Sequence, residues 1–285
     1  MEDFLINING QIHKGPEAKI SVFDRGFLYG DSVYESTRTF SKKAFRINQH
    51  IDRLFLSAEK IFIIPTFTKE QILCEVLKTI QASSYNDIIL RIVLTRGTNN
   101  DLGLDPDLSG KNNLIIFSKE IKPNPASWLS NGVSMIFFQR QMEVSGSLPK
   151  TGNYQENMLG LRQAHLVSAY DAFLINTHGY VTEGTTSNAW IIKNGVLYTP
   201  SLADGVLDGL TRKTLLEMAK CHKLPLPLIE KSLTPEDFKT ADECFITSTT
   251  RNIVPVTILE GQKIGSGTPG KVTLKILELY LEFVN

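Results

Sequence analysis

The chain has 285 residues, of which 42% are apolar, and its 30 basic and 30 acidic residues leave no formal net charge. This length can bury the core of one large domain or of two packed domains, and the mixed charges leave no footprint for nucleic acid or an anionic membrane. The cysteines Cys74, Cys221 and Cys244 are far apart and in no metal-ligand spacing, which favours a reducing compartment and no bound metal. Because the N-terminus lacks a basic leader and no apolar run approaches a membrane span, we expect a soluble cytoplasmic protein.

The N-terminal part of the chain alternates strand patterns with two helical patterns. Helices are expected at 46–60, with Asn48 as N-cap, and at 68–83. Residues 97–111 are rich in glycine and aspartate and form a long loop for a compact domain, which favours a functional role. Strands are expected at 4–8, 11–13, 32–40, 88–95 and 114–118, with Asn9-Gly10 as the turn of a hairpin between the first two.

Polar side chains recur on one face of the expected strand 32–40. The two-residue period of a strand places Tyr34, Ser36 and Arg38 on the same side, where they can line a pocket. Arg91 stands inside another expected strand that is otherwise apolar, so its guanidinium needs a carboxylate partner. A structural carboxylate and a substrate carboxylate are equally good partners on this evidence.

Arg53 is a second arginine in apolar surroundings. It lies near the apolar stripe of the expected helix 46–60, where a guanidinium is costly unless an anion meets it. An exposed ion pair with a residue one helical turn away is an equal alternative.

Residues 119–127, which read KEIKPNPAS, predict a domain boundary because they combine two prolines with no apolar periodicity. We therefore expect an α/β protein with a smaller N-terminal domain at 1–118 and a larger C-terminal domain at 128–285. In the second domain helices are expected at about 154–170 and at 214–220. Strands are expected at 133–139, 172–176, 188–192, 196–198 and 244–247, with Asn194-Gly195 as a hairpin turn.

Lys150 is the lysine whose surroundings are least typical of a surface residue. It follows a proline and precedes Thr151-Gly152-Asn153-Tyr154, which predicts a sharp turn that holds the ammonium beside small and apolar neighbours. A poorly solvated lysine loses its proton more readily and becomes a nucleophilic amine that can form a Schiff base with a carbonyl cofactor. A loop lysine in water is the common alternative, so the case for Lys150 depends on its neighbours.

Glu183 is the first of these neighbours. It lies between the expected strands 172–176 and 188–192 and beside Gly184, where a carboxylate can approach another group closely. If that group is a pyridine nitrogen, the anion keeps it protonated and makes the ring an electron sink. A capping or turn glutamate is an equal alternative.

Two further segments have anion-binding geometry. Residues 206–212 open a helix, so glycine, free N–H groups and a threonine hydroxyl gather at a helix N-terminus. The strand 244–247 runs into the hydroxyl-rich turn 248–251. Each signal is common alone, but together with Lys150 and Glu183 they describe a site for an aldehyde cofactor that carries a ring nitrogen and a phosphate, which is pyridoxal phosphate.

Six segments follow one another along nearly the whole chain in an order that resembles a known motif series. They are FLYGDSVYE, HIDRLFLSAEKI, PKTGNYQENM, YVTEGTTSNAWIIKNGVLYTP, GVLDGLTRKTLLEMA and FITSTTRNIVPV. The series is similar to that of the class IV aminotransferases, the fold type IV pyridoxal-phosphate family of branched-chain and D-amino acid aminotransferases and aminodeoxychorismate lyase. The resemblance implies two α/β domains with the cofactor between them, assembled as a homodimer whose active sites borrow residues across the interface.

The resemblance also implies roles for single residues. Lys150 would hold pyridoxal 5'-phosphate as a Schiff base and move the substrate's α-proton, Glu183 would meet the pyridine nitrogen, and Tyr154 would hydrogen-bond the phenolic oxygen. The phosphate would be held by Arg53, Leu210, Thr211, Ser248 and Thr249. The substrate would be bound by Tyr29, Tyr34, Arg38, Arg91 and Thr250.

Residues in the middle of the first domain indicate which type of class IV aminotransferase the chain resembles. LRIVLTRG followed by DLGLDP is more similar to the branched-chain enzymes, in which residues matching Arg91 and the neighbouring subunit's Tyr29 receive the side-chain carboxylate of glutamate. We therefore expect ping-pong amino transfer with 2-oxoglutarate as acceptor. The Arg-x-His of D-amino acid enzymes is missing from 99–103. Ile89 and Ser36 stand where branched-chain enzymes usually have tyrosine and glycine, so Arg38 is a candidate for carboxylate binding.

Other functions stay open beside this one. A D-amino acid aminotransferase is the first alternative, and aminodeoxychorismate lyase, which needs no keto-acid acceptor, is the second. A pyridoxal-phosphate carrier without enzyme activity is the binding-protein alternative.

Overall fold

The computed structural model describes residues 4–143 and 146–284, which fold into two compact units. The first unit comprises Met1–Lys122 and Pro149–Asn153, and the second comprises Pro123–Leu148 and Tyr154–Asn285. The chain thus passes from the first unit to the second within the predicted boundary segment 119–127. Strand β6 (Leu114–Glu120) runs into the start of that segment, and the domain bounds 1–118 and 128–285 stay a prediction.

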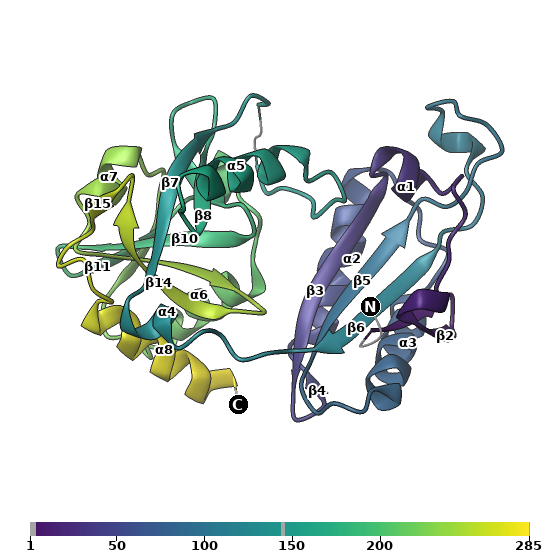
Figure 1. Ribbon diagram of the computed structural model, residues 1–285, viewed down its shortest axis with the longest axis horizontal. Helices are drawn as coiled ribbons and strands as arrows, with labels where there is room; N and C mark the ends of the chain where they lie inside the picture. Colours follow the sequence, from purple (N-terminus) through teal and green to yellow (C-terminus); the bar gives the residue numbers. More distant parts are fainter. Residues whose placement is uncertain (1–3, 144–145, 285) are drawn as a thin grey trace. The chain divides into compact units, whose positions relative to one another are not determined.

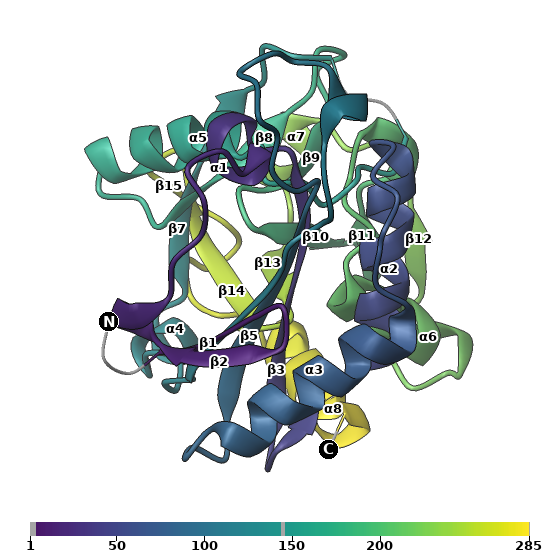
Figure 2. The same cartoon turned by 90° about the vertical axis from the view of Figure 1, so that its right-hand side faces the viewer.

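The first unit is built on a six-stranded antiparallel sheet with the strand order β2-β1-β6-β5-β3-β4 (Figure 1). Two long helices, α2 and α3, cover one face of this sheet (Figure 2). The other strands are β1 (Leu5–Ile8), β2 (Gln11–Lys14), β3 (Ser32–Phe40), β4 (Lys43–Ala44) and β5 (Ile88–Thr95). The helices are α1 (Arg25–Tyr29), α2 (Ile47–Lys60) and α3 (Lys69–Ala82), with 3-10 turns at Gly15–Glu17 and Pro106–Leu108.

Alternation along β5 explains which face of the sheet the helices cover. Leu90, Ile92 and Leu94 are buried in the core that α2 and α3 close, and each such side chain contributes about 1.5–3 kcal/mol of burial free energy. The residues between them, among them Arg91, lie on the face that α2 and α3 do not cover. The prediction that Tyr34 and its alternate neighbours share one face of β3 is confirmed by the same alternation of burial.

The predicted elements of this unit are found with small shifts at their ends. The hairpin at Asn9-Gly10 is confirmed, with both residues at positive φ. Helix α3 begins with a capping box between Thr68 and Gln71, as a helix at 68–83 requires. The predicted N-cap Asn48 is wrong, because Arg46 in a left-handed conformation takes that place and Asn48 lies within α2.

The second unit contains a nine-stranded sheet that closes on itself. Its pairings run β10-β13-β14-β7-β8-β9 and return from β9 to β10. The strands are β7 (Val133–Gln139), β8 (Asp171–Ile175), β9 (Val181–Gly184), β10 (Ser187–Lys193), β11 (Val196–Thr199), β12 (Leu228–Glu230), β13 (Glu243–Ser248), β14 (Asn252–Leu259) and β15 (Gln262–Lys263). The helices are α4 (Ser127–Ser130), α5 (Gln155–Leu166), α6 (Leu210–Lys220), α7 (Pro235–Lys239) and α8 (Lys271–Val284), with a 3-10 turn at Leu202–Asp204.

Helices pack against this closed sheet on different sides (Figure 1). Helices α6 and α8 cover β13 and β14, where Trp190 stacks on Phe245 with the ring centroids 5.7 Å apart. Helix α5 packs on β7 and β8 around Phe138 and Leu174. The sheet is therefore covered by apolar helix faces, and the ends of its strands are left to carry polar residues.

Two expectations for this unit need correction. The helix predicted at 154–170 ends at Leu166, because the chain turns at Ser168, which has a positive φ, before β8 begins. Glu183 does not lie between two strands but inside the short strand β9, which pairs with both β8 and β10. The hairpin at Asn194-Gly195 is confirmed. None of the described helices has the length and apolar content that crossing a bilayer requires.

Candidate active site

The segment around Lys150 runs along β3 and is joined to it by an isolated β-bridge between Val33 and Thr151. The Tyr34 N–H donates to the Lys150 carbonyl at 2.9 Å, and the Gly152 N–H donates to the Ser32 carbonyl at 2.9 Å. The Lys150 N–H donates in turn to the Ser57 hydroxyl of α2 at 3.0 Å. The Val33–Thr151 bridge holds this segment against β3, and the predicted turn is found just after Lys150, where the chain bends at Gly152.

Glycine is required beside this segment. A Cβ at Gly152 would lie 2.4 Å from the Ser32 hydroxyl and 3.0 Å from the Gly30 carbonyl oxygen. Only a residue without a side chain lets the backbone approach β3 so closely. Gly152 thus contributes to the register that presents Lys150.

The Lys150 side chain meets an aromatic hydroxyl. Its Nζ donates to the Tyr34 Oη at 3.2 Å and lies 4.4 Å from the centroid of the Tyr34 ring. The guanidinium of Arg91 lies 5.0 Å from the same centroid. Two cations therefore flank one tyrosine ring on the sheet face that α2 and α3 do not cover.

Arg91 and Arg38 belong to that same face. Arg91 pairs across the strands with Ser36, and Arg38 pairs with Ile89. Within 4–143 and 146–284, Arg91 has no carboxylate partner, so the structural ion pair considered for it is not found. Arg38 lies over the ring of Phe40, with 4.2 Å between guanidinium and centroid.

The opposite side of β3 carries a buried ionic cluster. Arg53 donates from Nε to Glu35 Oε1 and from a terminal nitrogen to Glu35 Oε2, both at 2.7 Å. His50 Nδ1 lies 2.7 Å from Glu35 Oε2. The exposed ion pair considered for Arg53 is therefore wrong, because the anion that meets it is the fully buried Glu35.

Electrostatics keep Glu35 ionised in spite of its burial. Burial alone would raise the pKa of its carboxyl, but the charge and hydrogen bonds of Arg53 and the hydrogen bond of His50 lower that pKa to about 2. Burial also lowers the pKa of the His50 imidazole, and the contact with Glu35 opposes that shift only in part.

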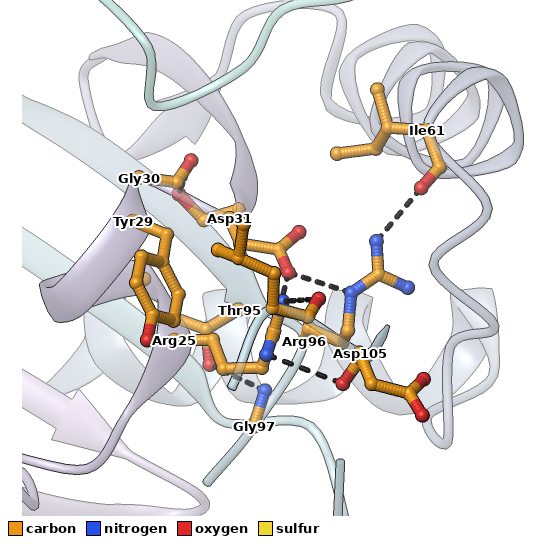
Figure 3. A network of polar contacts seen from close by, with 12 residues as sticks. Arg25, Tyr29, Gly30, Asp31, Ile61, Thr95, Arg96, Gly97 and Asp105 are labelled. Atoms are coloured by element: carbon orange, nitrogen blue, oxygen red, sulfur yellow. Dashed lines mark hydrogen bonds and ion pairs between the residues drawn. The ribbon is translucent and has the colours of Figure 1, made fainter. Parts of the chain in front are cut away.

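Asp31 organises the long loop that the sequence marks as functional (Figure 3). It accepts from Arg25 Nε at 2.9 Å and from Arg96 Nε at 2.7 Å. Burial would raise the pKa of Asp31, but the hydrogen bonds from Arg96 and Arg25 lower it below its usual value. The guanidinium of Arg25 donates to the carbonyls of Gly103, Leu104 and Asp105.

Tyr29 takes part in the same arrangement. It ends α1, and its hydroxyl donates to the carbonyl of Leu102 in the loop. The Arg96 guanidinium donates to the carbonyls of Ile61 and Phe62. Sequence reasoning missed Arg25 and Arg96 because most of their partners are backbone carbonyls. It missed Asp31 because only the fold brings the two guanidinium groups to its carboxylate.

In the second unit Glu183 is buried and held by donors. Its Oε2 accepts from the Leu207 N–H at 3.1 Å and lies 3.5 Å from the Asn188 side-chain nitrogen. Its Oε1 lies 3.8 Å from a terminal nitrogen of Arg140. These donors suit an ionised carboxylate. Sequence reasoning missed Asn188, in β10, and Arg140, which follows β7, because they lie far apart in the chain.

The N-terminus of α6 is an anion-binding candidate. The cap residue is Gly209, so no side chain occupies the first free N–H groups of the helix. The Thr211 hydroxyl is buried and has no hydrogen-bond partner among the described residues. A Cβ at Gly209 would lie 1.9 Å from the Asn188 side-chain oxygen, so the helix start and the Glu183 environment share a close contact.

The turn after β13 holds the remaining predicted residues of this unit. Ser248 ends β13, and Thr249 and Thr250 form the turn. Arg251 donates to the Ser248 hydroxyl at 3.0 Å and to the Thr186 carbonyl at 2.8 Å, which ties this turn to the one between β9 and β10.

The predicted site residues are divided between the two units. The first unit carries Lys150, Arg53, Tyr29, Tyr34, Arg38 and Arg91. The second carries Glu183, Leu210, Thr211, Ser248, Thr249, Thr250 and Tyr154, the last as N-cap of α5. No group of three or more potential metal ligands occurs within 4–143 and 146–284.

Comparisons with known proteins extend over almost the whole chain. The family profile described as "Amino-transferase class IV" matches residues 32–259. A protein of Methanocaldococcus jannaschii provisionally named branched-chain-amino-acid aminotransferase is 36% identical over 275 residues, which is 96% of this chain and 94% of that protein. The D-alanine aminotransferase of Bacillus licheniformis is 33% identical over 273 residues, 94% of this chain and 93% of that protein.

Solved structures of similar fold agree with these relatives. A T.th. branched-chain amino acid aminotransferase with pyridoxamine 5'-phosphate has a TM-score of 0.90 and 27% identity, covering 98% of this chain and 93% of that one. The branched-chain aminotransferase of Thermoproteus uzoniensis with norvaline has a TM-score of 0.86 and 28% identity, covering 98% and 94%.

The chain belongs to the class IV aminotransferases. It is a pyridoxal-phosphate-dependent transaminase with the mixed α/β fold of the fold type IV enzymes. The resemblance on which the sequence analysis rested is thereby confirmed at the level of family, fold, reaction class and cofactor.

Proposed function

We propose that this transaminase is of the branched-chain type and uses 2-oxoglutarate as amino acceptor. The observation that carries the proposal is Arg91, a cation that lies on the same sheet face as the Lys150 amine and has no carboxylate partner among the described residues. Such an arginine suits the side-chain carboxylate of a five-carbon dicarboxylic acid. The T.th. branched-chain enzyme, which has the same fold, was also solved with N-(5'-phosphopyridoxyl)-L-glutamate, which supports a glutamate-derived partner.

The residues of the chain fit pyridoxal phosphate. The buried Thr211 hydroxyl, without a partner among the described residues, and the uncapped start of α6 match the donors that a phosphate requires. Glu183, surrounded by donors, matches an ionised carboxylate that can pair with a protonated ring nitrogen. We propose that Arg53, Leu210, Thr211, Ser248 and Thr249 hold the phosphate, and that Tyr154 meets the phenolic oxygen.

The same residues define what the chain contributes to catalysis. When bound, pyridoxal phosphate supplies a carbonyl that exchanges for the substrate amine and a ring that withdraws electrons from the α-carbon. Lys150 would supply the amine that holds the cofactor and moves the α-proton, and the Tyr34 hydroxyl accepts a hydrogen bond from that amine. Glu183 would stabilise the protonated ring nitrogen of the cofactor.

Substituting Arg91 tests the acceptor assignment. The Arg91→Ala enzyme is expected to lose about ten- to a hundred-fold in kcat/KM for 2-oxoglutarate, because a charge-assisted pair contributes about 1.5–3 kcal/mol. The kcat/KM for 4-methyl-2-oxopentanoate, which has no second carboxylate, should change little. Steady-state kinetics with both acceptors and one amino donor measure this discrimination.

Arg38→Ala is the matched control on the same face. Arg38 is proposed to meet the α-carboxylate that every acceptor carries, so its loss should lower kcat/KM for both acceptors alike. Tyr29 and Thr250 complete the proposed substrate contacts. Equal losses for both acceptors in Arg91→Ala would contradict the proposal that Arg91 reads the second carboxylate.

A D-amino acid aminotransferase is the second candidate, favoured by the 33% identity to the Bacillus licheniformis enzyme. Single-turnover reactions with L-leucine, L-glutamate, D-alanine and D-glutamate separate the candidates through the loss of cofactor colour. Faster reaction with the D-enantiomers would reject the branched-chain assignment. Formation of pyruvate from aminodeoxychorismate without a keto-acid acceptor would instead indicate the lyase.

We also propose that the protein works as a homodimer in the cytoplasm. The family resemblance supports the dimer, and the three cysteines, which form no disulfide among the described residues, support a reducing compartment. Light scattering should give twice the mass of the 31.9 kDa chain. A monomer mass at micromolar concentration would contradict the dimer. Recovery of the protein outside the cytoplasmic fraction would contradict the cytoplasmic location.

A further inference from the structure

We propose that Glu35 and His50 are positioning residues that orient Arg53 for the phosphate of the cofactor. The proposal rests on the proposed function, since it takes Arg53 as a phosphate contact. Glu35 and His50 lie on β3 and α2, on the side of β3 opposite to Tyr34, so neither side chain shares the substrate-facing surface. Glu35 contacts Arg53 directly, and His50 reaches the arginine through Glu35.

The contacts of Glu35 fix the plane of the Arg53 guanidinium. Two parallel bonds of 2.7 Å join Nε and one terminal nitrogen of Arg53 to the two oxygens of Glu35. A bidentate pair of this kind removes the rotational freedom that a long arginine side chain otherwise has. Glu35 is fully buried and the Arg53 side chain is 11% exposed, so solvent does not compete for these bonds.

His50 fixes the carboxylate in turn. Because an ionised carboxylate only accepts hydrogen bonds, the contact of 2.7 Å means that His50 Nδ1 carries the proton and donates to Glu35 Oε2. The other ring nitrogen is buried and has no hydrogen-bond partner among the described residues, which suits a neutral imidazole better than a protonated one. A neutral His50 holds Glu35 without adding a second cation beside Arg53.

This arrangement meets a specific electrostatic need. Burying an arginine without an anion costs free energy. An arginine that can pair with several groups does not keep one side-chain orientation. Glu35 neutralises the guanidinium in the fold and fixes its direction before any phosphate binds. The orientation is therefore present in the apoenzyme, so that binding does not have to order the side chain.

The test compares the affinity of the apoenzyme for pyridoxal phosphate and for pyridoxal, which lacks the phosphate. Glu35→Gln keeps the shape of the side chain but removes its charge and one acceptor. We expect the dissociation constant for pyridoxal phosphate, from absorbance titration, to rise about ten-fold or more, while that for pyridoxal changes less than about two-fold. Glu75→Gln is the matched control in the same unit, because Glu75 contacts Asn7 and not Arg53.

A second pair of variants separates positioning from general damage to the fold. His50→Asn keeps a donor near the position of Nδ1 and should retain most of the phosphate preference, whereas His50→Leu should lose it. Equal weakening for both ligands in Glu35→Gln, or no difference between the two His50 variants, would overturn the proposal. Denaturant unfolding of each apoenzyme shows whether the variant is folded during the titration.

Arg53→Gln distinguishes a failure of this inference from a failure of the proposed function. If Arg53→Gln keeps the phosphate preference, Arg53 is no phosphate contact and the proposed function is wrong at that point. If Arg53→Gln loses the preference and Glu35→Gln keeps it, only the positioning role is wrong. We expect the double variant to lose no more preference than Arg53→Gln alone, because the two residues act as one unit.

Discussion

At the scale of single residues, the groups proposed for catalysis differ in the partners that surround them. Glu183 is surrounded by an N–H group, an amide and a guanidinium. Lys150 has a tyrosine hydroxyl as a partner, and this neutral group holds the amine in place.

Glu183→Gln tests the role of that charge. The variant keeps the side-chain shape and an acceptor for Leu207, so pyridoxal-phosphate affinity should change only a few-fold. The half-reaction with an amino donor should slow by about 10²–10³, as expected for the loss of one stabilising electrostatic contact in the transition state. Stopped-flow measurement of the colour change gives the rate.

Glu243→Gln is the control for that variant. Glu243 also accepts backbone N–H groups in the second unit, at the start of α8. Its loss should affect stability and leave the half-reaction nearly unchanged. Comparable rates for Glu183→Gln and the unmodified enzyme would remove Glu183 from the mechanism.

At the scale of elements, the N-terminus of α6 is the proposed phosphate site. A side chain that capped this helix would satisfy the free N–H groups and compete with a ligand, but Gly209 has none. Thr211 adds a buried hydroxyl with no partner among the described residues, whereas Thr214, one turn further, donates to the Leu210 carbonyl at 2.8 Å. We therefore expect Thr211 to bind the phosphate and Thr214 to stabilise the helix.

Replacing each threonine by the isosteric valine separates these purposes. Thr211→Val should leave the free energy of unfolding of the apoenzyme unchanged or slightly raised, because no hydrogen bond is lost, and should weaken pyridoxal phosphate about ten- to a hundred-fold. Thr214→Val should lower the free energy of unfolding by about 1 kcal/mol and leave cofactor affinity unchanged. Denaturant titration and absorbance titration measure the two quantities, and the opposite pattern would contradict the assignment of α6.

Local sequence patterns predict the elements better than they predict the contacts between elements. The alternation in 32–40 and 88–95 follows from burial on one face, so the strands and the face of Tyr34 are readable from the sequence. The placement of Lys150 along β3 is not, because it depends on the bridge between Val33 and Thr151 and on Ser57, far away in the chain. Glu35 is missed for the same reason, since only the packing of α2 on β3 brings an anion to Arg53.

At the scale of the whole molecule, the predicted site residues come from both units, and each unit has its own hydrophobic core. The charge of the chain is balanced, and its buried ion pairs make stability depend on pH. In the first unit the folded state lowers the pKa of Glu35 from 4.5 to about 2 and lowers that of His50 below 6.5. In both cases the unfolded chain takes up a proton at a pH where the folded chain does not.

The apoenzyme is therefore expected to lose stability on acidification. The contribution of His50 is fully present above about pH 6.5 and is lost as the pH falls through its lowered pKa. The contribution of Glu35 is present above pH 4.5 and amounts to about 3 kcal/mol, which is lost as the pH falls towards 2. Denaturant unfolding between about pH 7.5 and about pH 2 should show this slope, and Glu35→Gln should flatten its acid end. Stability that stays level or rises below about pH 6 would contradict the buried cluster.

The most direct test of the central claim is to find where the cofactor is attached. The purified enzyme should absorb in the visible, and borohydride should fix the phosphopyridoxyl group onto one lysine. Peptide mapping by mass spectrometry is predicted to find it on Lys150, and Lys150→Ala should carry no label and have no transaminase activity. Recovery of the label on another lysine, or full activity in Lys150→Ala, would contradict the account.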